Sequence, residues 1–319
     1  MIIDLPSTTT SSVNRRMVEM RESGGAVTTG RVLTLVIVTD DGSDTEDAIA
    51  AANEASHEHP CRVIVLGRGA RKAVARLDAQ IRVGGDAGAS EVVVLRLYGP
   101  LAEHGDSVVV PFLLPDTPVV AWWPGEPPPV PAQDPIGQLA NRRITDASAS
   151  PNPVRALSQR HASYADGDTD LAWSRLTPWR ALLASALDQP PFEPVTAATV
   201  TGAADSPSSD LLAGWLASNL DVPVKRVRGG EGIVSVELER RSGPVALVRP
   251  EGTTAVLTQP GQPDRTVALG RRQVRDCLAE ELRRLDADEV YERALAGLAQ
   301  VKRSRAAVKA PVAARRSAS

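Results

Sequence analysis

The feature that most constrains the fold is a set of short, continuous apolar runs. The first, VLTLVIV at 32–38, is followed by RVIVLG at 62–67, VVVLRL at 92–97 and a shorter run at 119–123. Strands that are apolar on both faces are typical of parallel sheets covered by helices. Helical or turn-rich segments separate the runs, which indicates βαβ crossovers. The sequence therefore predicts an α/β fold that begins with a Rossmann-like parallel sheet and flanking helices.

The hydrophobic period changes in the second half of the chain. A helix is expected from Asp168 or Thr169 to Ala186, and short alternating runs at 233–239, 245–248 and 254–257 follow it. Gly-Pro and Pro-Glu-Gly segments separate these runs, as in β-hairpins. We therefore expect a smaller α+β unit with an antiparallel meander, one face of which is exposed to solvent. The expected domains are an α/β domain at 1–165, an α+β domain at 166–301 and a tail at 302–319.

The tail at 302–319 carries six basic residues and no acidic ones, and its composition predicts disorder. Removing these six charges from the net charge of −3 leaves −9 for the rest of the chain. An acidic body is a poor match for nucleic acid. No apolar run approaches the length of a membrane span, and no signal-peptide pattern opens the chain. We expect a cytoplasmic protein with neither nucleic acid nor membrane as a partner.

Two adjacent tryptophans, Trp122 and Trp123, end the fourth apolar run and precede a proline-rich loop at 124–135. Neighbouring strand residues point to opposite faces of a sheet. Helices on both faces could cover the two rings, or one ring could reach a partner surface beside the loop. On the second interpretation Trp122 and Trp123 are partner-binding residues. Arg142 and Arg143 are further candidates for binding an anion or an acidic partner, with surface ion pairing as the alternative.

A phosphate site is the main small-ligand hypothesis. The turn after the first strand, at 39–47, holds one glycine and five carboxylates, so it lacks the dinucleotide-binding fingerprint. The segment after the second strand is more suitable, because Arg68, Arg71 and Lys72 follow it closely. These three residues are candidate phosphate ligands, and an exposed helix start is the alternative reading of the segment.

Residues that would carry catalysis or bind metal are not apparent. His57 and His59 end a helix at Pro60, and too few other histidines occur to complete a zinc site. No GxSxG elbow is present. Cys61 and Cys277 are expected to be inert core thiols without a mutual disulfide, because we place them in different units. The sequence predicts no catalytic residue, no metal and no cofactor.

Six segments of the chain together resemble one known family. They are IDLPSTTTSSVNRRM, ASHEHPCRVIVL, GASEVVVLRLYGPLAEHGDSVVVPFLLPDTPVVAWWP, NRRITDAS, GDTDLAWSRLTPWRALLASALDQPP and CLAEELRRLDADEVYERAL. In this order they are similar to the glucose-6-phosphate dehydrogenase assembly protein OpcA family over nearly all of residues 1–300.

The resemblance implies a non-catalytic assembly factor and allosteric activator of glucose-6-phosphate dehydrogenase. Such a protein would act in the oxidative pentose phosphate pathway and in NADPH metabolism by stabilising the active oligomer of the dehydrogenase. The alternative is a sugar-phosphate-binding enzyme of the same pathway, a lactonase or an isomerase, in which Arg68, Arg71 and Lys72 hold the phosphate.

Overall fold

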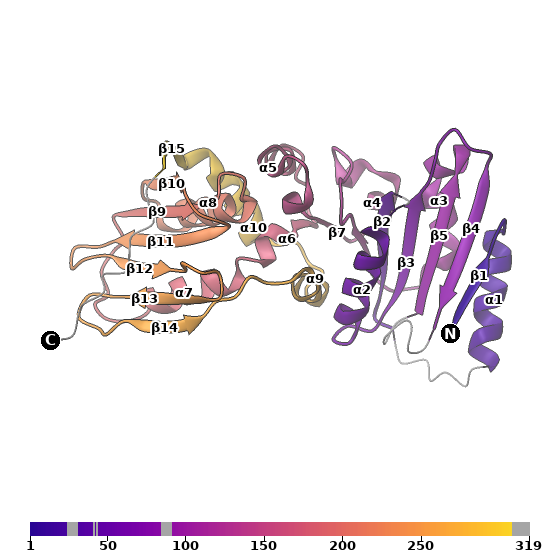
Figure 1. Ribbon diagram of the computed structural model, residues 1–319, viewed down its shortest axis with the longest axis horizontal. Coiled ribbons are helices and arrows are strands. Elements are labelled where there is room, and N and C mark those ends of the chain that lie inside the picture. The colour runs from indigo at the N-terminus through magenta and orange to yellow at the C-terminus, as the bar shows by residue number, and fades with distance from the viewer. Residues whose placement is uncertain (24–30, 41, 43, 84–90, 308–319) are drawn as a thin grey trace. The chain divides into compact units, whose positions relative to one another are not determined.

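The computed structural model describes residues 1–23, 31–40, 42, 44–83 and 91–307. The chain forms two compact units, each with its own sheet (Figure 1). Unit 1 consists of Met1–Pro151, Ala162–Ser174 and Gln273–Asp288, and unit 2 of Asn152–His161, Arg175–Arg272 and the chain from Glu289. The chain therefore leaves unit 1 and returns to it twice, so neither unit is one continuous segment.

Unit 1 is built on the eight-stranded sheet A, in the order β1-β4-β5-β3-β2-β6-β7-β8. The strands are β1 (Ile2–Leu5), β2 (Leu33–Asp40), β3 (Cys61–Arg68), β4 (Arg76–Arg82), β5 (Glu91–Tyr98), β6 (Val119–Trp122), β7 (Arg142–Thr145) and β8 (Asp168–Asp170). Six of them, from β5 to β8 in this order, are parallel to one another. Strand β4 is antiparallel to β5, and β1 is antiparallel to β4. The predicted parallel α/β fold is confirmed, with an antiparallel edge that the sequence analysis missed.

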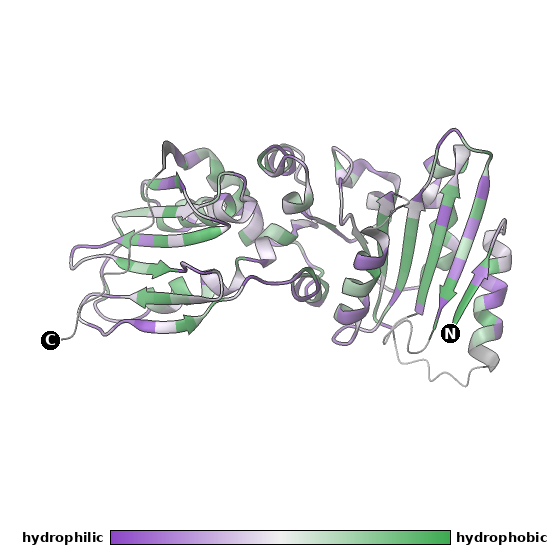
Figure 2. Cartoon of the chain, viewed as in Figure 1, coloured by the Kyte–Doolittle hydropathy of each residue, from purple (hydrophilic) through white to green (hydrophobic). Residues whose placement is uncertain are grey.

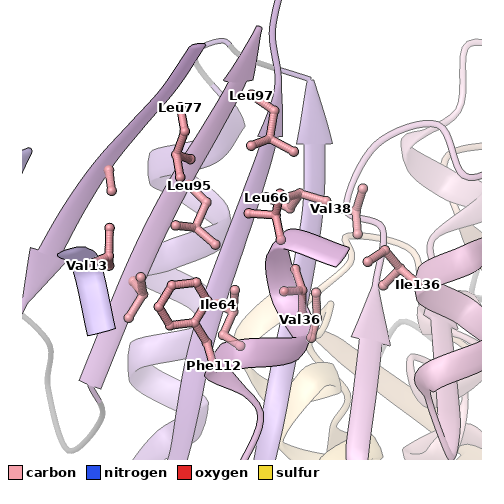
Figure 3. Packing of buried hydrophobic residues seen from close by; sticks show 14 of the residues in the cluster. Val13, Val36, Val38, Ile64, Leu66, Leu77, Leu95, Leu97, Phe112 and Ile136 are labelled. Carbon is pink, nitrogen blue, oxygen red and sulfur yellow. The ribbon is translucent and has the colours of Figure 1, made fainter. Parts of the chain in front are cut away.

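Helices cover both faces of sheet A, because alternate residues of the central strands point to opposite sides. In β2, Val36 and Val38 belong to one core cluster, whereas Leu35 and Ile37 belong to the other. Figure 3 shows the first cluster, in which Phe112 packs over the strands. Figure 2 shows the matching pattern of apolar strands between amphipathic helices.

The helices of unit 1 are α1 (Thr10–Ser23), α2 (Asp44–Ser56), α3 (Gly105–Val109), α4 (Pro135–Leu139), α6 (Leu171–Ser174) and α9 (Val274–Arg283), with 3-10 turns η2 (Gly99–Glu103), η3 (Val110–Phe112), η4 (Pro131–Gln133) and η5 (Ala147–Ala149).

Helix α9 completes the second face of sheet A although it follows the strands of unit 2 in the sequence. Its residues Cys277, Leu278 and Leu282 are buried with α2 and with alternate residues of β2, β3 and β5. Cys61 and Cys277 consequently share one core cluster, and both side chains are fully buried and in no disulfide. Our reason for expecting no disulfide between them was therefore wrong, since both lie in unit 1.

The tryptophan pair is part of the core. Trp122 belongs to the cluster under α2 and α9, and Trp123 to the cluster under α1, α3 and α4. Each ring is 1% exposed. The opposite orientation of the rings is as expected, but the predicted partner contact of Trp122 and Trp123 is wrong, because helices cover both rings.

Unit 2 is built on the seven-stranded sheet B, in the order β14-β13-β12-β11-β9-β10-β15. The strands are β9 (Ala197–Gly202), β10 (Val224–Arg228), β11 (Ile233–Glu239), β12 (Val245–Val248), β13 (Thr254–Thr258), β14 (Arg265–Ala268) and β15 (Lys302–Ala307). The predicted antiparallel meander is confirmed in β11, β12 and β13, and it continues into β14, which was not predicted. The helices are α5 (Pro153–Ala162), α7 (Thr177–Leu187), α8 (Pro207–Leu220) and α10 (Glu289–Gly297), with the 3-10 turn η6 (Leu298–Gln300).

Two expectations for the second half of the chain need correction. The single helix predicted up to Ala186 is divided into β8, α6 and α7, because the Asp170 carboxylate accepts the backbone N–H of Ala172 and starts a new helix there. The tail is not disordered throughout, since residues 302–307 form β15 beside β10. Hydrogen bonding to a strand orders this segment in spite of its polar composition. Residues 308–319 lie outside the described part of the chain.

Truncating either ring of the tryptophan pair should destabilise the protein strongly. We expect Trp122→Ala and Trp123→Ala each to lower the free energy of unfolding by about 3–5 kcal/mol, because each leaves a large cavity. Phenylalanine at either position should cost much less, since neither indole Nε1 has a hydrogen-bond partner among the described residues. The matched control is Trp215→Ala on α8, where the ring is partly exposed. Urea unfolding measures all five variants, and a cost for Trp122→Ala no larger than the control's would contradict the burial.

Candidate functional site at the carboxyl edge of sheet A

The topology of sheet A singles out one place for a ligand. Strand β2 lies inside the sheet, with β3 on one side of it and β6 on the other. The chain proceeds from β2 to β3 and later crosses back to β6, so the strand order reverses between β2 and β6. In open α/β sheets, ligands bind outside the carboxyl ends of the strands at this switch point.

A hollow of about 230 Å³ lies at the switch point. The residues that line it include Asp40 and Glu126, which carry carboxylates, together with Arg68 and Trp123. The other lining residues are Val38, Thr39, Gly42, Pro124 and Gly125. Two carboxylates against one cation make the hollow a poor site for a phosphate. Hydroxyl or amine groups, which donate hydrogen bonds to carboxylates, would fit it better.

A second hollow, of about 170 Å³, tests the phosphate hypothesis directly. Arg68 and Arg71 both line it, so the structure brings these two predicted residues together, but Lys72 is exposed and is not part of the wall. Each arginine already faces a carboxylate: Arg68 Nη2 lies 3.5 Å from Asp134 Oδ2, and Arg71 Nη1 lies 3.9 Å from Glu103 Oε1. Asp106 adds a third carboxylate to the wall. A phosphate here would have to compete with these carboxylates.

The segment that carries Arg71 and Lys72 is a turn and not a helix start. It leads from β3 into the antiparallel strand β4. The N–H of Gly99, at the start of η2, donates to the carbonyl of Ala70 at 3.0 Å and links the turn to the end of β5. Gly99 has a φ of +64°, and a Cβ there would lie 2.4 Å from the carbonyl oxygen of Ala73. This turn therefore requires glycine at 99.

Sequence reasoning missed a further hollow in unit 1. It measures about 780 Å³ and lies between the start of α1 and the start of β4. Hydroxyl side chains form much of its wall, together with Arg76 and the apolar residues Leu77, Leu101 and Val108. The hydroxyl residues are Ser7, Thr8, Thr9, Thr10 and Ser107. The run PSTTT at 6–10 could have indicated this hollow. We did not read it as a site because a run of hydroxyl residues before a helix usually indicates an N-cap.

Arg142 and Arg143, predicted to bind a partner or an anion, are instead buried on β7, which lies between β6 and β8 in sheet A. Arg142 donates to Glu281 of α9 and, at 2.6 Å, to the carbonyl of Asp286, and Ser174 holds the other oxygen of Glu281. Arg143 donates to Asp168 and to the carbonyls of Ala140 and Asp166. Both predictions are wrong, as is the surface-pairing alternative, because β7 is an interior strand whose arginines are neutralised within unit 1.

The carboxyl ends of β7 and β8 carry a close pair of carboxyl groups. Asp170 is fully buried and accepts hydrogen bonds from Thr145 Oγ1 at 2.6 Å and from the N–H groups of Ala147 and Ala172 at 2.9 Å. Burial, and secondly the charge of Asp146, raise the pKa of Asp170 to about 7. The three donors oppose this shift by stabilising the ionised carboxylate.

The described residues were also compared with the requirements of a metal site and of a membrane-spanning helix. Within those ranges, no group of three or more histidine, cysteine, aspartate or glutamate side chains is placed to hold a metal ion. None of the helices in the described segments is long and apolar enough to cross a bilayer.

The raised pKa of Asp170 predicts a pH-dependent stability. Its pKa lies above the unfolded value of 3.8, so the folded state holds the proton more tightly, and this stabilisation is lost as the pH rises from about 4 to about 7. Asp170→Asn removes the titration. We expect the free energy of unfolding of the variant, relative to that of the unmodified protein, to increase between pH 5 and pH 8 by a difference on the order of 2–4 kcal/mol, which thermal melting at each pH measures. Ser148→Ala, which leaves Asp170 intact, is the control, and parallel melting curves of variant and parent across this range would contradict the assignment.

Comparison with solved structures gives weak likenesses. A crystal structure described as glucose-6-phosphate 1-dehydrogenase from Mycobacterium avium is 11% identical, covers 87% of this chain and 94% of its own, and has a TM-score of 0.43. An E. coli structure, described as trehalose-6-phosphate bound with UDP-2-fluoro glucose, is 9% identical, covers 61% of this chain and 64% of its own, and has a TM-score of 0.24. Similarities of this size carry no argument about ligand or activity.

Comparison of the sequence is more informative. A Synechocystis sp. protein named OpcA, and assigned by its name to the OxPP cycle, is 29% identical over 203 residues. The match covers 56% of this chain and 40% of that protein, so this chain spans less than half of its relative. Two family models match in succession: the glucose-6-phosphate dehydrogenase subunit N-terminal domain at residues 52–162 and its C-terminal domain at residues 166–295. Together these matches show that the chain belongs to the OpcA family of glucose-6-phosphate dehydrogenase assembly proteins.

Proposed function

We propose that this protein is a non-catalytic assembly factor and activator of glucose-6-phosphate dehydrogenase, acting in the oxidative pentose phosphate pathway in the cytoplasm. The observation that carries the proposal is the consecutive match of both dehydrogenase-subunit domain models over 52–162 and 166–295. The two matches keep their order and are separated by three residues, so this chain carries both matched domains in succession.

An activator of this kind works by differential affinity. It stabilises the active oligomer of its partner only to the extent that it binds that state more tightly than the inactive one. It needs a stable binding surface and no catalytic group of its own. The buried ion pairs of Arg142 and Arg143 are consistent with such a role, because they commit charged side chains to holding the protein together.

The alternative, a sugar-phosphate lactonase or isomerase, is favoured by one observation: Arg68 and Arg71 line one hollow at the carboxyl edge of sheet A. Phosphate binding by Arg68, Arg71 and Lys72 is thus a second proposal. The carboxylates of Glu103, Asp106 and Asp134 on the same wall weigh against it, because all three repel a phosphate, and Asp134 and Glu103 already pair with the arginines.

Mixing the purified protein with its cognate dehydrogenase tests the proposal. We expect a higher rate or a lower apparent KM for glucose 6-phosphate, saturating at a fixed ratio of the two proteins, and a larger fraction of dehydrogenase in its oligomeric form by light scattering. The protein alone should turn over neither glucose 6-phosphate nor 6-phosphogluconolactone. An unchanged dehydrogenase rate across a saturating titration of the folded protein would refute activation, and turnover without dehydrogenase would favour the enzyme.

A further inference from the structure

One edge of sheet B is formed by two basic strands that lie side by side. Strand β15 is the outermost strand on this side and pairs in parallel with β10 (Figure 1). The register places Lys225 directly opposite Lys302 and Arg226 opposite Arg303. Neither strand contains an acidic residue, since their sequences are VKRVR and KRSRAA.

The positive charge of this edge is only partly neutralised. Arg226 is buried, and its Nε lies 2.9 Å from Asp210 Oδ1 on α8. Arg303 Nη1 lies 3.1 Å from the other oxygen of the same carboxylate. Burial, and to a smaller extent the charges of Arg303 and Arg228, lower the pKa of Arg226, although Asp210 opposes the shift. One carboxylate therefore serves two arginines, and Lys225, Arg228, Lys302 and Arg303 are exposed; we call these four residues the basic edge.

Protection against aggregation does not account for the basic edge. Proteins often place lysine on an exposed edge strand to prevent pairing with another chain. That purpose requires charge on the outermost strand alone. Here the second strand is basic as well, and like charges directly opposite each other in a strand pair are destabilising. A loss of strand-pair stability of this kind is expected where the charged side chains bind a ligand.

We propose that the basic edge docks an acidic, extended segment of the dehydrogenase, which adds to sheet B as a further strand beside β15. This inference rests on the proposed function. The outer backbone groups of an edge strand offer a ladder of hydrogen bonds to a polypeptide, and nearby lysine and arginine side chains would select acidic residues in it. A second copy of this chain is a poor occupant, since two basic edges repel each other. Nucleic acid matches the charge but cannot use the backbone ladder.

Two charge reversals separate docking from strand stability. Lys302→Glu creates an opposite-charge pair with Lys225, so it should raise the melting temperature while it weakens binding of the dehydrogenase. The double variant Lys225→Glu, Lys302→Glu restores a like-charge pair and should melt near the parent, yet bind the dehydrogenase about tenfold more weakly or worse. The matched control is Arg241→Glu, Arg265→Glu, which makes the same change of charge in the β11–β12 turn and on β14, at the opposite edge of sheet B.

The measurements are the dissociation constant of the complex at low and high salt and the melting temperature of each variant. The expected result is loss of affinity and of salt dependence in both basic-edge variants, with parent-like binding in the control. Parent-like binding by the double variant would overturn the docking site and leave the proposed function standing. Failure of the unmodified protein to bind dehydrogenase would overturn both. Binding of a DNA oligonucleotide in place of the dehydrogenase, abolished by the same reversals, would also overturn the proposal.

Discussion

Unit 1 depends on the buried ion pair between Arg142 of β7 and Glu281 of α9. Both side chains are almost fully buried, at 2% and 4% exposure, and Ser174 and the carbonyl of Asp286 satisfy their remaining hydrogen-bonding groups. Such a pair contributes little net stability against an apolar replacement, but removing one partner typically costs about 3–5 kcal/mol because the other charge stays buried. Its role is therefore positional: it fixes α9 over the second face of sheet A, where Leu278 and Leu282 close the core.

Because of this arrangement, unit 1 depends on a segment that comes late in the chain. The helix that completes unit 1 is synthesised after the strands β9 to β14 of unit 2. Without it, the apolar side of α2 and alternate residues of β2, β3 and β5 would lose part of their cover. The stability of unit 1 is thus tied to residues 273–288, and a truncation before them would expose apolar surface.

Local sequence patterns were sufficient for the elements that bury apolar residues on regular periods. The runs at 32–38 and 62–67 became the buried strands β2 and β3. The patterns failed where partners are distant. Strand β7 is RRIT, whose arginines become core residues only when Glu281 and Asp168 reach them, and β4 has an apolar residue only at every second position. The candidate site shows the same limit: the sequence suggested Arg68 and Arg71, but not the carboxylates of Asp134 and Glu103 that face them.

The two sheets place charge in opposite ways. Sheet A buries Arg62, Arg142 and Arg143 and pairs each with a carboxylate, so these charges hold the fold together. At the outer strands of sheet B, two arginines share the single carboxylate of Asp210, and Lys225 faces Lys302 at a cost in strand stability. Because the chain without residues 302–319 carries a net charge of −9, the ordering of residues 302–307 concentrates cations on an otherwise acidic protein. An acidic body would repel an acidic partner except at this edge, so the same distribution that weakens the strand pair would also orient an approaching acidic segment.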